Sequence, residues 1–474
     1  MEPLPTRPLT CISTFLLAAT IHAQFPRLWG MTSAGGDNNK GTIFYIDGDG
    51  TDYTNVYHFS DASGWDAEGT LCLAPNGKIY GTTVLGGEGV AAQAGTLFSY
   101  DPSTSTFTKL VDFDLLNNGG YGWAGMVVGN DGLLYGANFG GGSGGSIYRV
   151  DPATGAFEMR YLLNSTTDGG GIEDRLLLAA DGTFYGLASQ NGANNAGTLF
   201  HYDPGTNAFT TLHHFDGAAN GRTPYGTPCE AGDGWLYFTT WAGGSANKGT
   251  FCRYRIANAT FEKLMDFTGP NGDSPWNAPV RVGPDLLMGT VALGGTNSGG
   301  LIYRYVPSTN TYTEAFSFNS LNGGLLFGNV MQATDGDFYG IGGSGGANFQ
   351  GSVYRFDPVG NTTTTLHSCS VAGGHSGRGN LIQAGLAVGI GENEAAVDFS
   401  VFPNPTSGPV TVSFGEAIPS GAVLRITDAV GKLVVEERIQ RSPTIVRIAT
   451  GPGVYQLTLV TGEQRSSRLV AVTD

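Results

Sequence analysis

The chain has 474 residues, of which 76 are glycine, about twice the usual share of roughly 7%. The glycines follow no Gly-X-Y period and 40% of the residues are apolar, so the composition favours a turn-rich all-β fold over a collagen-like or low-complexity chain. A formal net charge of -16 argues against nucleic acid and against an anionic membrane surface as partners, because their phosphates attract Lys and Arg.

The first 23 residues are typical of a secretory signal peptide. Arg7 precedes an apolar run over residues 11–21, and small residues ending at Ala23 offer a cleavage site. We therefore expect the mature chain to begin near Gln24. The apolar run is too short to cross a bilayer, and no later stretch is predicted to be a transmembrane segment.

One phrase of about eight residues recurs seven times in the mature chain. Its copies start 50 to 54 residues apart by subtraction of their first positions: GTIFYID at Gly41, GTLFSYDP at Gly95, GSIYRVDP at Gly145, GTLFHYDP at Gly197, GTFCRYRI at Gly249, GLIYRYVP at Gly300 and GSVYRFDP at Gly351. A second phrase, such as IYGTTVLGG from Ile79, precedes each copy. Seven copies at a nearly constant period indicate a repeat architecture.

Each repeat is predicted to hold four short strands, which we call a to d in chain order. Asn-Gly and Asp-Gly pairs, strong hairpin signals, join a to b, and Asp-Pro turns join c to d. Strand c is apolar on both faces, as in Leu97 and Phe98, so its sheet must be covered on both sides. Neighbouring blades of a propeller provide such cover, and the predicted fold class is an all-β, seven-bladed β-propeller with four-stranded blades.

The ends of the repeat region predict that the ring closes. The mature chain starts with strand b at Leu28, without a strand a before it, and a lone strand a follows the last repeat over residues 379–385. These two segments are expected to share one blade, which removes the exposed edges of an open stack. The predicted organisation is a signal peptide (1–23), a propeller (24–385), a linker (386–397) and a small β-sandwich (398–474).

The repeated phrases resemble the GloVer-type tandem repeat of bacterial exported proteins, whose consensus is of the LYGTT-GG-GT(V/L)F-DG kind. The resemblance covers residues 28–385. It implies an exported repeat protein, and it brings no established catalytic residues to this chain.

The last 77 residues resemble a type A C-terminal sorting domain of type IX secretion, found in Bacteroidetes-like bacteria. The phrases that carry the resemblance lie at Phe402, Pro403, Asn404, Pro405, Gly408, Gly431, Lys432, Gly453 and Tyr455. The chain ends in Thr473-Asp474, whereas many such tails end in Lys or Arg. The resemblance implies the type IX secretion machinery as a partner, removal of the tail, and release or attachment at the outer-membrane surface.

The position just before strand a is the best candidate for ligand binding. Because the d-to-a and b-to-c loops should lie on one face, these side chains are expected around the mouth of the central channel, where aromatic rings could stack on sugars. A position that repeats with the fold is more often structural, and packing between blades is the competing interpretation. In blade order the residues are Glu68, Trp123, Glu173, Tyr225, Trp276, Phe327 and Arg378.

Other motifs predict structure more than chemistry, and we expect no metal ion and no cofactor. Lys40 and Lys248 stand in Lys-Gly-Thr, the wrong order for a phosphate loop. The acidic DGDGTD segment at 47–52 lacks the terminal Glu of a calcium loop and is predicted to be a turn. A polar slot near the end of strand d lacks a converging triad; it holds His58, Asp112, His214, Asp266, Ser317 and Ser368. Without CxxC pairs, four buried free thiols are expected, at Cys72, Cys229, Cys252 and Cys369.

Two functions remain open for the exported protein. The favoured one is a monomeric, non-enzymatic module that binds a glycan or another small ligand, or serves as a scaffold, outside the cell. The alternative is a carbohydrate-active hydrolase or lyase at the channel mouth, in which Glu68 and Glu173 would form the pair of carboxyl groups that glycosidases need. A purely structural role would leave no ligand at all.

Overall fold

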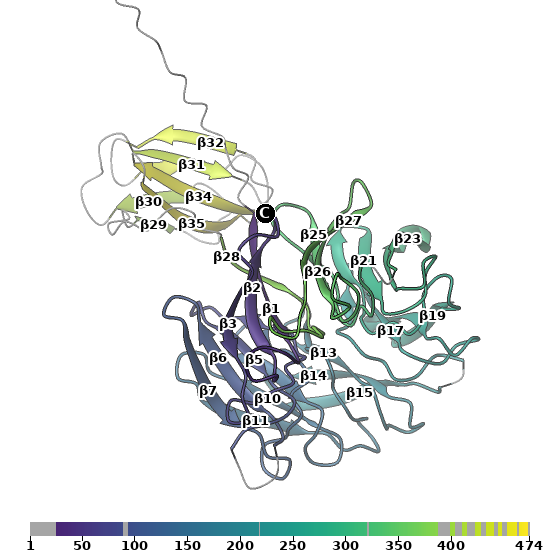
Figure 1. The fold of residues 1–474 in the computed structure, drawn as a ribbon. Helices are drawn as coiled ribbons and strands as arrows, with labels where there is room; N and C mark the ends of the chain where they lie inside the picture. Colours follow the sequence, from purple (N-terminus) through teal and green to yellow (C-terminus); the bar gives the residue numbers. More distant parts are fainter. Residues whose placement is uncertain are drawn as a thin grey trace, which may run out of the picture.

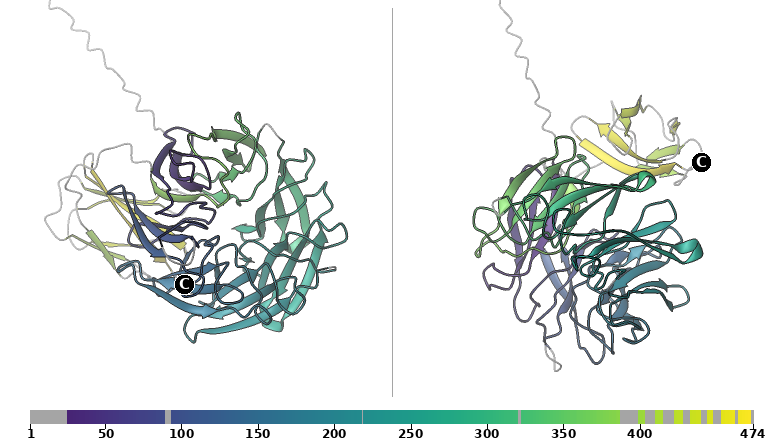
Figure 2. Two further views of the ribbon diagram at one scale, coloured as in Figure 1. Left: turned by 60° about the horizontal axis from the view of Figure 1, so that its bottom comes forward. Right: turned by 90° about the vertical axis from the view of Figure 1, so that its right-hand side faces the viewer.

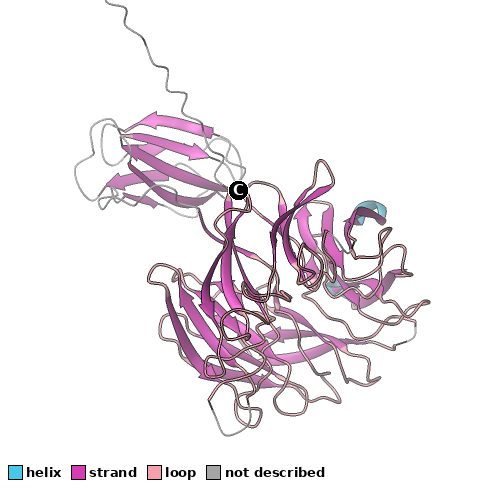
Figure 3. Ribbon diagram, in the orientation of Figure 1, coloured by secondary structure: helices cyan, strands magenta, loops and turns pink. Residues whose placement is uncertain are grey.

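The computed structural model describes residues 25–88, 93–217, 219–319 and 322–386 of the repeat region. In the C-terminal part it describes residues 399–402, 410–414, 422–427, 433–439, 444–447, 453–461 and 464–472. These residues form an all-β, propeller-like protein (Figures 1 and 3). Seven four-stranded antiparallel sheets come from the described part of the repeat region, and two further sheets come from the tail.

Each repeat contributes one sheet, and the strands follow the predicted order a to d. The first sheet contains β1 (Pro26–Thr32), β2 (Thr42–Asp47) and β3 (Thr54–His58), and the next contains β4 (Cys72–Leu73), β5 (Ile79–Thr82), β6 (Thr96–Asp101) and β7 (Thr106–Asp112). The third and fourth contain β8 (Val127–Val128), β9 (Leu134–Asn138), β10 (Ser146–Val150) and β11 (Phe157–Leu162), then β12 (Leu177–Leu178), β13 (Phe184–Ala188), β14 (Thr198–Asp203) and β15 (Ala208–His214).

The remaining three repeats follow the same plan. Their sheets contain β16 (Cys229–Glu230), β17 (Trp235–Thr240), β18 (Thr250–Arg255) and β19 (Thr260–Asp266); β20 (Val280–Gly283), β21 (Leu286–Val291), β22 (Leu301–Val306) and β23 (Thr311–Ser317); and β24 (Met331–Gln332), β25 (Phe338–Gly342), β26 (Ser352–Asp357) and β27 (Thr362–Ser368). Two c-to-d turns form single 3-10 turns, η1 (Ile256–Asn258) and η2 (Pro307–Thr309). Both lack the Asp that stands at this position in the other repeats and caps the turn in four of them, as Asp101 does when its carboxylate accepts the N–H of Ser103.

The lone strand after the last repeat pairs with the first strand of the chain. This strand, β28 (Ile382–Leu386), lies antiparallel to β1, with Trp29 opposite Ile382 and Leu28 opposite Gln383. The indole Nε1 of Trp29 also donates a buried hydrogen bond of 2.8 Å to the carbonyl of Ala384. The left view of Figure 2 shows the sheets following one another around a ring, with the start of the chain beside the end of the repeat region.

Apolar packing continues from each sheet to the next all the way around this ring. Seven clusters of buried side chains each draw on two neighbouring sheets. The cluster that joins the last sheet to the first contains Leu28 and Phe44 with Tyr339, Ile341 and Val353. This explains why strand c is apolar on both faces: each face of its sheet packs against another sheet.

A pairing between strands b and c explains why the second repeated phrase has a glycine at its third position, as Gly81 in IYGTTVLGG. In six sheets this glycine lies directly opposite an aromatic residue of strand c, as Gly186 lies opposite Phe200. A Cβ at Gly186 would come within 2.3 Å of the ring of Phe200. In the fifth sheet the two sizes are exchanged, because Phe238 lies opposite Cys252. Each sheet thus has room for only one large side chain at this pair of opposite positions on strands b and c.

The tail forms two sheets that share one apolar core. One sheet contains β29 (Phe399–Phe402), β30 (Val410–Phe414) and β33 (Thr444–Val446). The other contains β31 (Val423–Thr427), β32 (Leu433–Arg438), β34 (Gly453–Thr461) and β35 (Gln464–Val472). Val412 and Val446 of the first sheet are buried in one cluster with Leu424 and Leu457 of the second.

The sorting motif falls partly within these strands. Phe402 ends β29, Gly453 begins β34, and the side chain of Tyr455 is buried in the shared core. The other motif positions lie outside the described residues: Pro403, Asn404, Pro405, Gly408, Gly431 and Lys432. The predicted linker begins at Leu386, which in the structure ends β28, and the rest of it also lies outside the described residues.

Candidate functional site

The residues predicted at the channel mouth do gather around one central cavity. The d-to-a and b-to-c loops lie side by side, as bridges such as Gly120 to Gly140 and Arg222 to Ala242 show. Both loop types therefore share one face, as expected. The cavity is lined by six of the seven predicted residues, namely Glu68, Trp123, Glu173, Trp276, Phe327 and Arg378.

One side of the mouth is aromatic. Tyr225, the predicted residue that does not line the cavity, stacks on Trp276 with ring centroids 4.3 Å apart and planes at 23°. Trp276 in turn meets the edge of Phe327, with centroids 5.1 Å apart. Trp241, which is 37% exposed, lies 6.2 Å from Tyr225. Tyr225, Trp276 and Phe327 are half-buried, so they pack against one another and still leave part of their surface in contact with solvent.

An ion pair forms the adjoining part of the mouth. Arg378 Nη1 lies 3.2 Å from Glu68 Oε2, and the guanidinium stands 4.8 Å from the ring centroid of Phe327. Burial raises the pKa of Glu68 to about 7, and the repulsion of Asp66 adds to this while the attraction of Arg378 opposes it. Glu68 therefore changes its charge near neutral pH.

Glu173 is the most isolated carboxyl group at the mouth. Ser189 Oγ donates a hydrogen bond of 2.6 Å to Glu173 Oε1. Glu173 Oε2 and the nearby Trp123 Nε1 are buried and have no partner among the residues that the structure describes. Burial raises the pKa of Glu173 to about 8, with a further contribution from the charge of Glu68. At neutral pH Glu173 is consequently a protonated acid that can donate a hydrogen bond.

The space enclosed behind these side chains is small. The cavity volume is about 30 Å³, enough for one or two water molecules, since a water needs about 10–15 Å³ by this measure. A ligand larger than water would therefore lie on the mouth, against the rings and the ion pair, and not inside this cavity.

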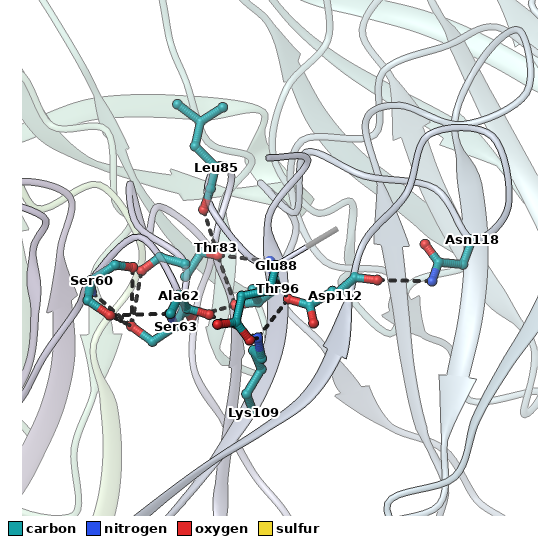
Figure 4. A network of polar contacts seen from close by, with 11 residues as sticks. Ser60, Ala62, Ser63, Thr83, Leu85, Glu88, Thr96, Lys109, Asp112 and Asn118 are labelled. Carbon is teal, nitrogen blue, oxygen red and sulfur yellow. Dashed lines mark hydrogen bonds and ion pairs between the residues drawn. The ribbon is translucent and has the colours of Figure 1, made fainter. Parts of the chain in front are cut away.

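The polar slot near the end of strand d has a structural role. Its side chains accept a backbone N–H from the b-to-c loop, and thereby hold that loop; they are His58, Asp112, His214, Asp266, Ser317 and Ser368. Figure 4 shows the second sheet, where Asp112 accepts the N–H of Glu88 at 2.9 Å and Lys109 Nζ contacts both carboxylates and the carbonyl of Ala62. The adjacent His213 instead stacks on Phe261, with ring centroids 4.1 Å apart, so it does not join His214 in a site.

The lysines and aspartates of the weaker motifs are also engaged in the fold. Lys40 pairs with Asp61 at 2.7 Å, and Lys248 pairs with Asp273 at 2.5 Å. In the acidic turn, Asp47 and Asp52 bind Arg27, while Asp49 accepts hydrogen bonds from Thr51. The four cysteines of the repeat region are free and buried, as predicted: Cys72, Cys229, Cys252 and Cys369.

Sequence reasoning missed the residues next to the mouth positions. Asp174, Asn277 and Asn380 also line the cavity, and Ser189 orients Glu173 from a neighbouring loop. The first three follow a mouth residue by one or two positions. Their place in the sequence was the available signal, because they lie in the same loop as the mouth residue, just before strand a.

Comparison with known families decides the relationship of the chain. The Gloeobacter/Verrucomicrobia repeat family matches residues 18–188 and 172–399. The chain belongs to the Gloeobacter/Verrucomicrobia repeat family. The secretion system C-terminal sorting domain family matches residues 400–472. Both resemblances seen in the sequence are thereby confirmed, and the sorting domain supports export by type IX secretion to the cell surface or the medium.

Other comparisons of this repeat protein give only distant likeness. No curated protein matches the sequence. Among solved structures, a periplasmic gluconolactonase of Pseudomonas aeruginosa is 13% identical, with 76% of this chain and 99% of that chain covered and a TM-score of 0.49. A putative 6-phosphogluconolactonase of Bacteroides uniformis is 12% identical, with 72% and 95% covered and a TM-score of 0.48. TolB of Acinetobacter baumannii is 15% identical, with 61% and 63% covered and a TM-score of 0.38.

Within the described residues, no helix has the length and apolar character needed to cross a membrane.

Proposed function

We propose that the repeat region is one closed, seven-bladed β-propeller and that the tail is a small β-sandwich. The pairing of β1 with β28 and the uninterrupted series of apolar clusters between sheets support the ring. The core shared by the two tail sheets supports the sandwich. The mature protein would begin near Gln24, act as a monomer, and be released or held at the outer-membrane surface after its tail has engaged the type IX secretion machinery.

The function that the geometry supports best is non-enzymatic binding of a small ligand, such as a glycan, at the channel mouth. The observation that carries this proposal is the run of half-buried rings at Tyr225, Trp276 and Phe327, continued by Arg378. Half-buried rings at a mouth can accept the flat apolar side of a sugar, while Arg378 and Glu68 supply groups that hydrogen-bond to hydroxyls.

A carbohydrate-active enzyme is the second candidate, because Glu68 and Glu173 line one cavity. Glycosidases use one protonated carboxyl group and one ionised carboxylate. Burial raises the pKa of both groups, to about 7 and about 8, so below neutral pH neither is an ionised partner. Above pH 7 the pair of Glu68 as base and Glu173 as acid would become available, which limits any such activity to neutral and alkaline conditions.

One set of experiments separates the two candidates. The full chain is applied to a glycan array, and each glycan that binds is then titrated by calorimetry and incubated for a reducing-sugar assay. Trp276→Ala should weaken binding about tenfold, because it removes the stacking face and its partner for Tyr225. Phe209→Ala is the matched control, since Phe209 stacks on Tyr161 in the outer strands, away from the mouth.

The outcomes are distinct. Binding without turnover that is lost in Trp276→Ala and kept in Phe209→Ala supports the binding function. Turnover that disappears in both Glu68→Gln and Glu173→Gln supports the enzyme. Equal affinities in the two aromatic variants would contradict a site at the mouth, and an array without any bound glycan would leave only the structural role.

A further inference from the structure

A second and larger cavity lies next to the cavity at the mouth. Its volume is about 230 Å³, and it is lined by side chains of β12, β16 and β20 and of the loops before them. It shares Asp174 and Asn380 with the mouth cavity, so the two adjoin. Ligand pockets are commonly about 300–1,000 Å³, so a space of this size suits a molecule no larger than a monosaccharide.

Two arginines of this cavity carry charges that the fold leaves unpaired. Arg175 and Arg281 both line it, and neither forms an ion pair with a carboxylate within the described part of the chain. Most other arginines of the repeat region are paired in this way, as Arg149 is with Glu158 and Arg253 is with Glu262. The other described arginines of the repeat region without an ion pair make different contacts: Arg222 donates to Asn247, Arg255 lies over the ring of Trp235, and Arg304 donates to the carbonyl of Pro358.

The two acidic residues of the cavity each accept a hydrogen bond from a backbone N–H. Glu230 Oε2 accepts the N–H of Ala180 at 2.9 Å, and Asp174 Oδ1 accepts the N–H of Arg175 at 2.7 Å. The Arg281 side chain is held in place without a counter-ion, because its Nε donates to the carbonyl of Gly283 at 3.2 Å. Arg281 is exposed, so the cavity is open to solvent and a ligand can reach it.

We propose that this cavity is a binding site for a small carboxylate, with Arg175 and Arg281 as its anion-binding groups. A guanidinium presents paired N–H donors that match the two oxygens of a carboxylate, which explains the use of arginine here. Leu177 and Val280, which also line the cavity, supply apolar contacts for the body of the ligand. Asp174 and Glu230 line the same cavity and balance the two positive charges, so the arginines would hold the ligand through directed hydrogen bonds to its carboxylate and not through a net positive charge.

The test uses the full chain and titration calorimetry with three probes: glucuronate, glucose and inorganic phosphate. We expect glucuronate to bind and glucose, the same ring without a carboxylate, to give no measurable binding. Arg175→Gln and Arg281→Gln should each weaken glucuronate binding at least tenfold. Arg149→Gln removes an arginine from the outer surface and should leave the affinity unchanged. Thermal unfolding of each variant reports folding, and Arg175→Lys replaces Arg175→Gln if the latter does not fold.

Three results would overturn the proposal. Equal glucuronate affinities in the wild type and in both arginine variants would exclude the guanidinium groups. Binding of phosphate without glucuronate would show that the cavity does not select carboxylates. Glucuronate binding that survives in both arginine variants and is lost in Trp276→Ala would place the ligand at the mouth instead. Because the comparison is between charged and uncharged probes, failure of the glycan array leaves this test unaffected.

Discussion

The buried acid at the channel mouth makes the stability of the protein depend on pH in an unusual direction. Glu173 has one hydrogen bond, from Ser189, and its second oxygen is buried without a partner among the described residues. Replacement by Gln keeps the shape and the accepting oxygen and removes the titration. We therefore expect Glu173→Gln to stabilise the protein at alkaline pH and to have little effect at about pH 4.5.

The magnitude follows from the difference between the folded and unfolded states. The ordinary pKa is 4.5, whereas burial raises the pKa of Glu173 to about 8 in the folded protein. Between these values the folded state holds a proton that the unfolded state has released, so stability falls as pH rises. One pKa unit corresponds to about 1.36 kcal/mol, and the loss therefore approaches about 5 kcal/mol above pH 8. Glu173→Gln should recover most of it.

The assay is urea unfolding of the wild type and the variant at pH 4.5, 6, 7.5 and 9. The gap between their unfolding free energies should widen steadily with pH. Glu68, whose pKa is raised to about 7 by burial, titrates in both proteins, so its own contribution largely cancels. Glu262→Gln is the control, because Glu262 is a half-exposed partner of Arg253 on the outer strands. A constant gap, or a wild type that becomes more stable between pH 5 and 8 relative to Glu173→Gln, would refute the reasoning.

Three further predictions concern the fold. Cys252→Phe should destabilise the protein by at least about 1–3 kcal/mol through overpacking against Phe238, and adding Phe238→Gly should restore most of the loss; a double-mutant cycle without coupling would contradict the size rule. Trp29→Phe should cost about 1–3 kcal/mol in denaturant unfolding, because the carbonyl of Ala384 loses its buried donor, and an unchanged midpoint would argue against that contact. Burial raises the pKa of the four cysteine thiols of the repeat region, so they should react with a thiol reagent only after denaturation; rapid labelling of these cysteines in the native protein would show that they are accessible.

Much of the architecture could be predicted because the signals that specify it are local and repeated. Asn-Gly, Asp-Gly and Asp-Pro turns set the ends of the strands, and the two apolar faces of strand c, as at Leu97 and Phe98, require a sheet on either side. The partner of the first strand could also be predicted. The repeat region begins at strand b and ends with an extra strand a, and this extra strand pairs with the first one. Positions at the mouth followed from the same register.

What the mouth residues do there depends on contacts between neighbouring sheets, whose residues can be far apart in the sequence. Glu68 and Glu173 are both glutamates before a strand a, yet only Glu68 meets an arginine, Arg378, which lies 310 positions later. The stacking of Tyr225 on Trp276 likewise joins two repeats. The sequence pattern treats these positions as equivalent, so it could not distinguish a paired carboxylate from a protonated acid.

The sequence by itself determined a repeat of four strands, its number of copies, the strand that pairs with the first strand of the chain and the C-terminal sorting domain. These properties depend on turn chemistry and on the alternation of apolar residues, which act within a few residues of the chain. Only the tertiary structure decided which charges are paired, which acids are buried and where space remains, because burial and Coulomb interactions depend on distances between residues far apart in sequence. The unpaired arginines Arg175 and Arg281 of the second cavity are among the features that only the tertiary structure shows.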